Sequence, residues 1–126
     1  MTDKLYSSFE VGRDDSGQLN FVELPFDAKR LYWLTGPTEM RGGHAHKNLF
    51  QVFLCMKGNA RVSISDGTTT HIVELRAGEG FKINPGLWRD VHPLLTGDLL
   101  LVAASEHFDE DDYIREKEVY LRWQRG

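Results

Sequence analysis

Two histidines, His44 and His46, stand two residues apart in a chain of 126 residues. If this segment is extended, both imidazoles leave the same face of a strand and can act together on one small molecule. Imidazole exchanges its proton near neutral pH, so the pair can serve as general acid and base, or as two ligands of one metal ion. Arg41 and two glycines precede the pair, and the glycines allow the backbone to turn closely. We therefore interpret the pair as functional rather than structural.

A metal site needs further ligands, and the surrounding residues argue against one. In metal-binding cupins a Glu follows the His-x-His pair, and this chain has Gln51 at that position, although a neutral amide is a poor ligand for a divalent transition metal. The second cupin motif expects a His five residues after a proline, where Pro85 leads to Asp90, and the neighbouring Arg89 would repel a cation. We predict a site without metal or other cofactor, with His92 as the remaining candidate for a third metal-binding histidine.

Short apolar or alternating segments, separated by Gly and Pro turn signals, make up most of the chain. The expected strands are residues 9–11, 18–24, 29–34, 50–57, 60–65, 69–75, 81–84, 87–92 and 98–104. Residues 108–113 are acidic and predict a loop, whereas residues 114–123 fit either a short helix or a last strand. The pattern predicts an all-β fold, a cupin-type jelly roll in which two sheets form a sandwich or barrel, with residues 1–126 as one domain.

Composition excludes several classes of function. The formal net charge is −4, which leaves no basic surplus to attract nucleic acid or an anionic membrane. No N-terminal segment resembles a signal peptide and no apolar run is long enough to span a membrane, so we expect a cytoplasmic protein. The single cysteine, Cys55, lies in an apolar run and is expected to be a small buried side chain without chemistry.

Four motifs follow one another along the chain: Arg-Gly-Gly-His-Ala-His-Lys at residues 41–47, Gln-Val at 51–52, Pro-x-x-Trp at 85–88, and Ala-Ser-x-x-Phe-Asp-Glu-x-Asp-Tyr-Ile-Arg at 104–115. Together they resemble the nucleotide-sugar 3,4-ketoisomerases, which are small cupin-like (WxcM-like) proteins, and the resemblance extends from about Leu19 to Tyr120. These proteins act on dTDP-4-keto-6-deoxyglucose on the way to amino sugars of cell-surface glycans such as lipopolysaccharide O-antigen. The resemblance implies an isomerase that moves the sugar carbonyl from C4 to C3 without a cofactor.

In that family the matched histidines are the catalytic acid/base residues, which implies this role for His44 and His46. A base must remove the proton on C3, an enediol-like intermediate must be stabilised, and a proton must return at C4. One histidine would handle the carbon-bound proton while the other shuttles protons between O3 and O4. The sequence leaves open which histidine does which.

Other residues are candidates for substrate binding. Tyr32 matches a tyrosine of the family's Arg-x-Tyr strand and can hydrogen-bond the sugar, or it is an aromatic residue on a half-buried strand. Arg41 can contact the diphosphate of the substrate or pair with a carboxylate. Gln51 can orient one histidine through a hydrogen bond, and Trp88 is either a core residue or a platform for the nucleoside. The carboxylates of the tail, residues 109–112, are expected in a solvated loop.

The chain departs from the family pattern at two positions. The family commonly has Arg-Gly where this chain reads Ser16-Gly17, so a cation that would face the substrate phosphate is missing. The familiar Trp-His-Glu is here Trp88-Arg89-Asp90. One hypothesis is that Arg89 restores the lost positive charge at the diphosphate, and the other is that the two changes mark a different substrate.

Three alternatives remain open beside the ketoisomerase. An epimerase or dehydratase on a related nucleotide sugar would use the same histidines, a non-catalytic cupin module would only bind such a sugar, and a metal-dependent oxygenase would need the missing ligands. The family assembles as homodimers that often exchange N-terminal strands, and a small β-sandwich with open edges has a physical reason to pair in this way. We therefore expect a homodimer with a nucleotide-sugar substrate.

Overall fold

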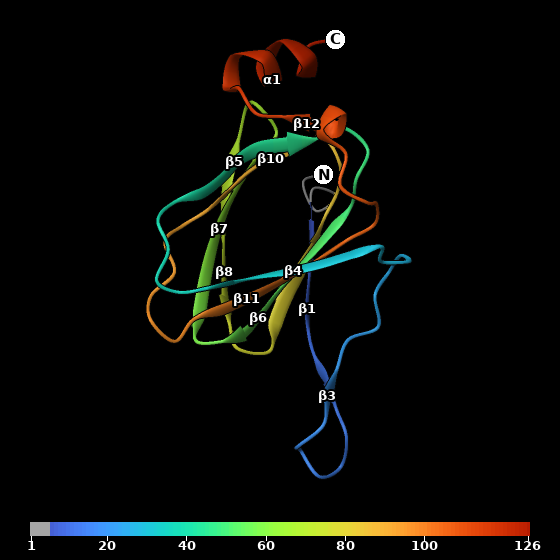
Figure 1. Ribbon diagram of the computed structural model, residues 1–126, viewed down its shortest axis with the longest axis vertical. Helices are drawn as coiled ribbons and strands as arrows, with labels where there is room; N and C mark the ends of the chain where they lie inside the picture. Colours follow the sequence, from blue (N-terminus) through green and yellow to red (C-terminus); the bar gives the residue numbers. More distant parts are fainter. Residues whose placement is uncertain (1–5) are drawn as a thin grey trace.

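Two five-stranded antiparallel sheets face each other in the structure, a computed structural model that describes residues 6–126 (Figure 1). The first sheet contains, in spatial order, β1 (Tyr6–Glu10), β9 (Glu79–Ile83), β6 (Gln51–Lys57), β11 (Leu99–Ala104) and β4 (Arg30–Thr35). The second contains β12 (Tyr113–Ile114), β5 (Arg41–His46), β10 (Trp88–Val91), β7 (Asn59–Ser65) and β8 (Thr70–Arg76). The predicted all-β double-sheet sandwich is confirmed. The polar residues 1–5, which belong to the predicted single domain, lie outside the described residues.

Alternation of side chains along the strands builds the core between the sheets. On β7, Ala60, Val62 and Ile64 are buried, while Arg61 between them is exposed, as the two-residue period of a strand requires. Phe53 on β6 and Phe81 on β9 stack with their ring centroids 5.2 Å apart. Cys55 is buried, as predicted, and burial raises the pKa of its thiol.

A small hairpin leaves the sandwich near the N-terminus. Its strands are β2 (Gly12–Arg13) and β3 (Asn20–Phe21), and they pair only with each other. The prediction of one strand over residues 18–24 is therefore wrong in extent, because this segment has no neighbour in either large sheet and its side chains are mostly exposed. Figure 1 shows the hairpin projecting away from the two sheets.

The C-terminal segment combines three short elements. A 3-10 helix, η1 (Glu110–Asp112), replaces part of the predicted loop and leads into β12, and an α-helix, α1 (Lys117–Gln124), follows. Of the two predicted possibilities for residues 114–123, the helix is the correct one. Tyr120 fixes α1 by donating its hydroxyl to the backbone oxygens of Ser65 and Gly86, at 3.1 and 2.8 Å. No helix among residues 6–126 is long and apolar enough to cross a membrane.

Candidate functional site

A glycine bulge sets the position of the histidines on β5. Gly42 and Gly43 have φ angles of +100° and +61°, which residues with a Cβ rarely adopt. A Cβ on Gly42 would lie 3.0 Å from the backbone oxygen of Arg89 on β10. The register between β5 and β10 shifts at this bulge, and the shift leaves His44 directly opposite Arg89. Gly42 is thus needed for the close approach of two backbones, whereas Gly43 is favoured by its positive φ.

The two imidazoles lie together on the interior face of β5, as expected from their spacing. Their ring centroids are 4.8 Å apart and the rings are nearly perpendicular, with an angle of 88° between the planes. Tyr113 on β12 closes the group, because its ring centroid lies 5.0 Å from that of His44 and 4.3 Å from that of His46. The Nε2 atoms of both histidines are buried and have no hydrogen-bond partner. Each Nε2, whether it carries a lone pair or a proton, is therefore available to a bound molecule.

Asp112, at the end of η1, contacts the Nδ1 side of the His46 ring. Its Oδ2 lies 3.2 Å from Nδ1 of His46, while its Oδ1 accepts hydrogen bonds from the backbone and side-chain nitrogens of Asn48 at 2.9 and 3.2 Å. The His46 side chain is fully buried and that of Asp112 is 11% exposed. The expectation that all the tail carboxylates are solvated is wrong for Asp112, because the tail folds back onto β5 as strand β12.

A second hydrogen-bond chain crosses the interior from one sheet to the other. The guanidinium of Arg89, which is 1% exposed, donates to Oε1 of Gln51 on β6 and, through Nη2, to the backbone oxygen of Leu87 at 3.0 Å. Gln51 in turn donates from Nε2 to the hydroxyl of Tyr32 on β4 at 3.1 Å. Gln51 thus bridges Arg89 and Tyr32, and within residues 6–126 no hydrogen bond joins its side chain to a histidine. The Nε of Arg89 is buried without a partner.

Burial and positive charge set the protonation states in this interior. Burial, and secondly the Arg89 guanidinium, lower the pKa of His44 to about 4, although a hydrogen bond with the Gly42 backbone acts in the opposite direction. The same two causes hold the pKa of His46 well below its ordinary value. Burial also lowers the pKa of Arg89 to about 10. At neutral pH the site therefore contains two neutral imidazoles beside a guanidinium cation.

Several residues singled out in the sequence do not join this group. Arg41 is exposed at the end of β5 opposite to His46, where it pairs with Val91. Trp88 lies in a second core cluster with Ala45, Ile114 and Tyr120, beneath α1, with the Lys117 ammonium 5.0 Å from its ring centroid. The position of Trp88 follows from strand geometry, because it is next to Arg89 and neighbouring side chains on a strand point to opposite faces.

His92 also lies apart from the pair, because its Nε2 is 2.6 Å from the Ser63 hydroxyl on β7. Residues 6–126 contain no group of three or more His, Cys, Asp or Glu side chains arranged to hold a metal ion.

Three side chains near the histidines were not assigned a role from the sequence: Asp112, Tyr113 and Arg30. Asp112 and Tyr113 belong to the tail motif, whose spacing gives no sign that it folds back onto β5. Arg30 stands two residues before Tyr32 on β4 and so shares its face. Its guanidinium carbon lies 5.5 Å from the Tyr32 ring centroid and 5.6 Å from that of Phe108. The two-residue alternation of this strand could have placed Arg30 on the same face as Tyr32.

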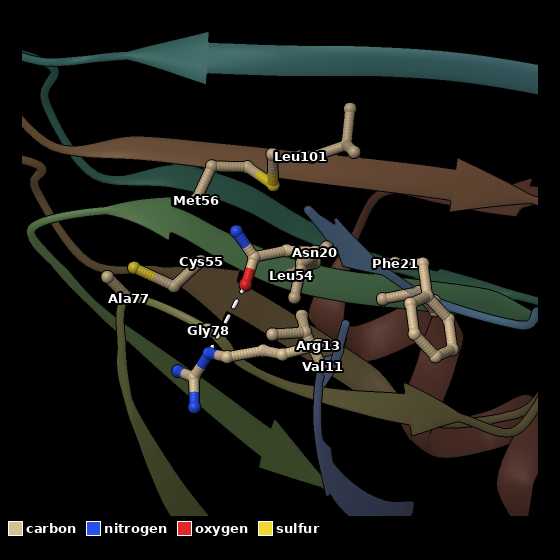
Figure 2. Close-up of a pocket in the computed structure, with 11 residues that line it drawn as sticks. Val11, Arg13, Asn20, Phe21, Leu54, Cys55, Met56, Ala77, Gly78 and Leu101 are labelled. Atoms are coloured by element: carbon tan, nitrogen blue, oxygen red, sulfur yellow. Dashed lines mark hydrogen bonds between the residues drawn. The ribbon is translucent and has the colours of Figure 1, made fainter. Parts of the chain in front are cut away.

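A groove with a volume of about 380 Å³ lies elsewhere, on the outer face of the first sheet (Figure 2). The hairpin contributes Arg13, Asn20 and Phe21 to its lining, and the sheet contributes Leu54 and Leu101. The Arg13 guanidinium donates from Nε to Oδ1 of Asn20 at 3.2 Å across the hairpin (Figure 2). None of the site residues lines this groove, so it belongs to a different surface of the molecule.

Comparisons with known proteins identify one family and relatives of one activity. The family described as FdtA: WxcM-like, C-terminal matches residues 3–125. A TDP-4-oxo-6-deoxy-alpha-D-glucose-3,4-oxoisomerase of Aneurinibacillus thermoaerophilus is 34% identical over 117 residues, which cover 87% of this chain and 84% of that protein.

Two solved structures are also similar to this one. A 3,4-ketoisomerase from Helicobacter canadensis has a TM-score of 0.86 and 33% identity, over 96% of this chain and 98% of the other. QdtA, a sugar 3,4-ketoisomerase from Thermoanaerobacterium thermosaccharolyticum in complex with TDP, has a TM-score of 0.84 and 35% identity, over 95% and 93%. A variant of QdtA was solved in complex with TDP-4-keto-6-deoxyglucose.

Proposed function

The chain belongs to the FdtA: WxcM-like, C-terminal family, and we propose that it is a 3,4-ketoisomerase that moves the carbonyl of a dTDP-4-keto-6-deoxyhexose from C4 to C3. The observation that carries this proposal is the pair of buried, neutral imidazoles whose Nε2 atoms have no partner within the chain. A ketoisomerase needs two groups that accept and return protons on one small molecule, and His44 and His46 meet that need without a cofactor.

The reaction divides into three proton movements. One imidazole takes the proton from C3, and the electron pair of the C3–H bond forms a C3–C4 double bond while the C4 carbonyl oxygen becomes an oxyanion. The other imidazole then passes the O3 proton to O4. Return of the first proton to C4 leaves a carbonyl at C3 and a hydroxyl at C4. Asp112 stabilises a positive His46 ring, so we assign the carbon-bound proton to His46 and the shuttle between the oxygens to His44.

The negative charge that develops on the sugar oxygens needs stabilisation in a dry interior. Arg89 supplies a permanent cation directly opposite His44, with a free N–H at Nε. Tyr32 accepts a hydrogen bond from Gln51, so its own hydroxyl proton is available for a sugar oxygen. Burial raises the pKa of Tyr32, which keeps that proton in place at neutral pH. These features support Arg89 and Tyr32 as substrate-binding residues, with Gln51 as the residue that positions them.

Proton NMR of the purified protein with dTDP-4-keto-6-deoxyglucose in heavy water tests the proposal. We expect wild type to form a 3-keto product and His44→Asn and His46→Asn to form none, while His92→Asn, a histidine on the outer side of the second sheet, behaves as wild type. Binding without product or exchange at C3 would identify a non-catalytic sugar-binding module. An inverted 4-keto sugar would identify an epimerase, loss of water a dehydratase, and turnover only with added metal a metal-dependent enzyme.

We also propose that the protein assembles as a homodimer through the outer face of the first sheet. Leu31, Trp33 and Met56 on this face are 56%, 61% and 50% exposed, and the adjoining groove is lined largely by apolar side chains (Figure 2). Ser16 lies in the loop between β2 and β3, and this hairpin projects away from both sheets, whereas the histidines lie on β5 (Figure 1). A residue at this position can face a substrate only if the hairpin reaches a second copy.

Location in the cytoplasm stays a prediction.

A further inference from the structure

The Tyr120 side chain on α1 is completely buried, and its hydroxyl is tied to backbone outside the helix. It donates to the backbone oxygen of Ser65 at 3.1 Å and to that of Gly86 at 2.8 Å. Burial, opposed by a hydrogen bond with the Trp88 backbone, raises the pKa of Tyr120 to about 12, so the hydroxyl remains a proton donor at neutral pH. A phenylalanine ring would fill nearly the same space without burying a polar group. The hydroxyl therefore serves as a tether rather than as packing volume.

Gly86 connects this tether to His46. It lies in the turn of residues 84–87 between β9 and β10, where its φ angle is +86°. Its N–H donates to the backbone oxygen of His46 at 2.7 Å. This bond continues the antiparallel pairing of β5 and β10 beyond the pair of Ala45 and Trp88, to the last residue of β5. The backbone of His46 is thus held by the same glycine that accepts a hydrogen bond from Tyr120.

The same turn also holds the cation of the site. The backbone oxygen of Leu87, the residue after Gly86, accepts a hydrogen bond from Nη2 of Arg89 at 3.0 Å. Arg89 in turn lies directly opposite His44 on β5. A displacement of this one turn would therefore move two groups of the site relative to a bound molecule. Groups that carry out chemistry must be held to within about 0.5 Å of their productive geometry, so such a displacement has a cost in rate.

We propose that Tyr120 is a positioning residue, which fixes His46 and Arg89 through the turn of residues 84–87 and so sets their geometry for proton transfer. The proton transfer rests on the proposed function, whereas the positioning rests on the contacts of the turn. Tyr120 itself belongs to the second core cluster, away from the group around the histidines. The C-terminal helix thus contributes to a site that it does not line.

Tyr120→Phe tests the proposal, because it removes the hydroxyl and keeps the ring. We expect kcat with dTDP-4-keto-6-deoxyglucose to fall about tenfold, since small misplacements of reacting groups are costly. The affinity for dTDP, which lacks the sugar, should stay unchanged in calorimetric titration. The NMR signals of the His46 imidazole should shift in the ligand-free variant, because the turn that holds the His46 backbone has lost its own anchor.

Gln124→Leu is the matched control on the same helix. Nε2 of Gln124 donates to the backbone oxygen of Asp66 at 2.6 Å, so this variant also loses a side-chain hydrogen bond from α1, but one that ends between β7 and β8. We expect its kcat and its His46 signals to match wild type. If urea denaturation shows that Tyr120→Phe does not fold, Gly86→Ala replaces it. A φ of +86° is strained for alanine, so the turn should shift and the same losses are expected.

Wild-type kcat in the folded Tyr120→Phe protein, or an equal loss in Gln124→Leu, would overturn the positioning role and leave the ketoisomerase intact. If wild type does not turn over the substrate, the ketoisomerase is wrong, and the His46 signals alone decide the positioning role. A shift in Tyr120→Phe but not in Gln124→Leu would then support it, and unchanged signals in both would overturn it.

Discussion

His46 and Asp112 are 66 residues apart in sequence, and Nδ1 of the histidine lies 3.2 Å from a carboxylate oxygen of the aspartate. A carboxylate can only accept a hydrogen bond, so the contact places the proton of neutral His46 on Nδ1 and the lone pair on Nε2. That Nε2 is buried and has no partner. In the proposed reaction Asp112 thereby makes His46 a base directed into the interior and stabilises the imidazolium that forms after proton transfer.

Asp112→Asn is therefore expected to lower kcat by roughly tenfold to a hundredfold, a part of what a positioned base contributes. The amide can present its NH₂ to Nδ1 and so favour the wrong tautomer. Affinity for dTDP should stay unchanged, because Asp112 acts through His46. Asp111→Asn, an exposed neighbour in the same 3-10 helix, is the control and should keep full activity. Equal kcat for both variants, measured by NMR turnover, would contradict the role of Asp112.

The acid limb of the pH profile should lie far below the ordinary pKa of histidine. The pKa of His44 is lowered to about 4, so its imidazole stays neutral and able to accept a proton as the pH falls through the range in which a solvated histidine is protonated. We expect kcat/KM to be nearly constant from about pH 8 to about pH 5 and to fall as the pH approaches 4. A limb centred near 6.5 would show that the histidines titrate as solvated groups.

Arg89→Met should raise the pKa of His44 without returning it to its ordinary value. The guanidinium is the second cause of the lowered pKa, and burial, the largest cause, remains in the variant. Loss of the cation opposite His44 should also reduce kcat, because the proposed oxyanion loses a positive charge in the same interior. NMR titration of the imidazole signals measures the shift. Unchanged His44 titration and unchanged kcat together would refute the electrostatic role of Arg89.

Gln51→Leu should destabilise the fold. Gln51 is completely buried and satisfies both Arg89 and Tyr32, so an apolar replacement leaves a buried cation and a buried hydroxyl without this partner. We expect the free energy of unfolding to fall by about 1–3 kcal/mol in urea denaturation. The exposed residue Gln18 offers the control Gln18→Leu, which should leave it within about 0.5 kcal/mol of wild type. A stable Gln51→Leu protein would mean that the chain of hydrogen bonds contributes little.

Trp33→Asp should convert the proposed dimer into monomers. Trp33 is 61% exposed on the outer face of the first sheet, where a buried interface would have to accommodate the new charge at high cost. Ile72→Asp introduces the same charge at a 56% exposed apolar residue on β8 of the second sheet and should remain dimeric. Light scattering after gel filtration gives the two masses. A monomeric wild type, or a dimeric Trp33→Asp, would exclude this face as the interface.

Patterns within short stretches of the sequence predicted the strands and the shared face of the two histidines. Strand period placed His44 and His46 on one face, and the glycines before them marked the bulge that sets β5 against β10. The contact of His46 with Asp112 could not be predicted in this way, because it depends on how a C-terminal segment folds back across the sheet. Residues 18–24 show the same limit, since alternation is compatible with a strand but does not supply a sheet for it to join.

The chain order of the site has a consequence for protein synthesis. Every strand of the two sheets except β12 precedes residue 105, whereas Asp112 and Tyr113, which complete the surroundings of the histidines, come later. A ribosome therefore releases nine of the ten sandwich strands before the residues that make His46 a directed base. A chain interrupted between residues 105 and 112 keeps most of the hydrophobic core yet lacks that carboxylate. The proposed proton transfer by His46 thus depends on residues that are synthesised after nine of the ten sandwich strands.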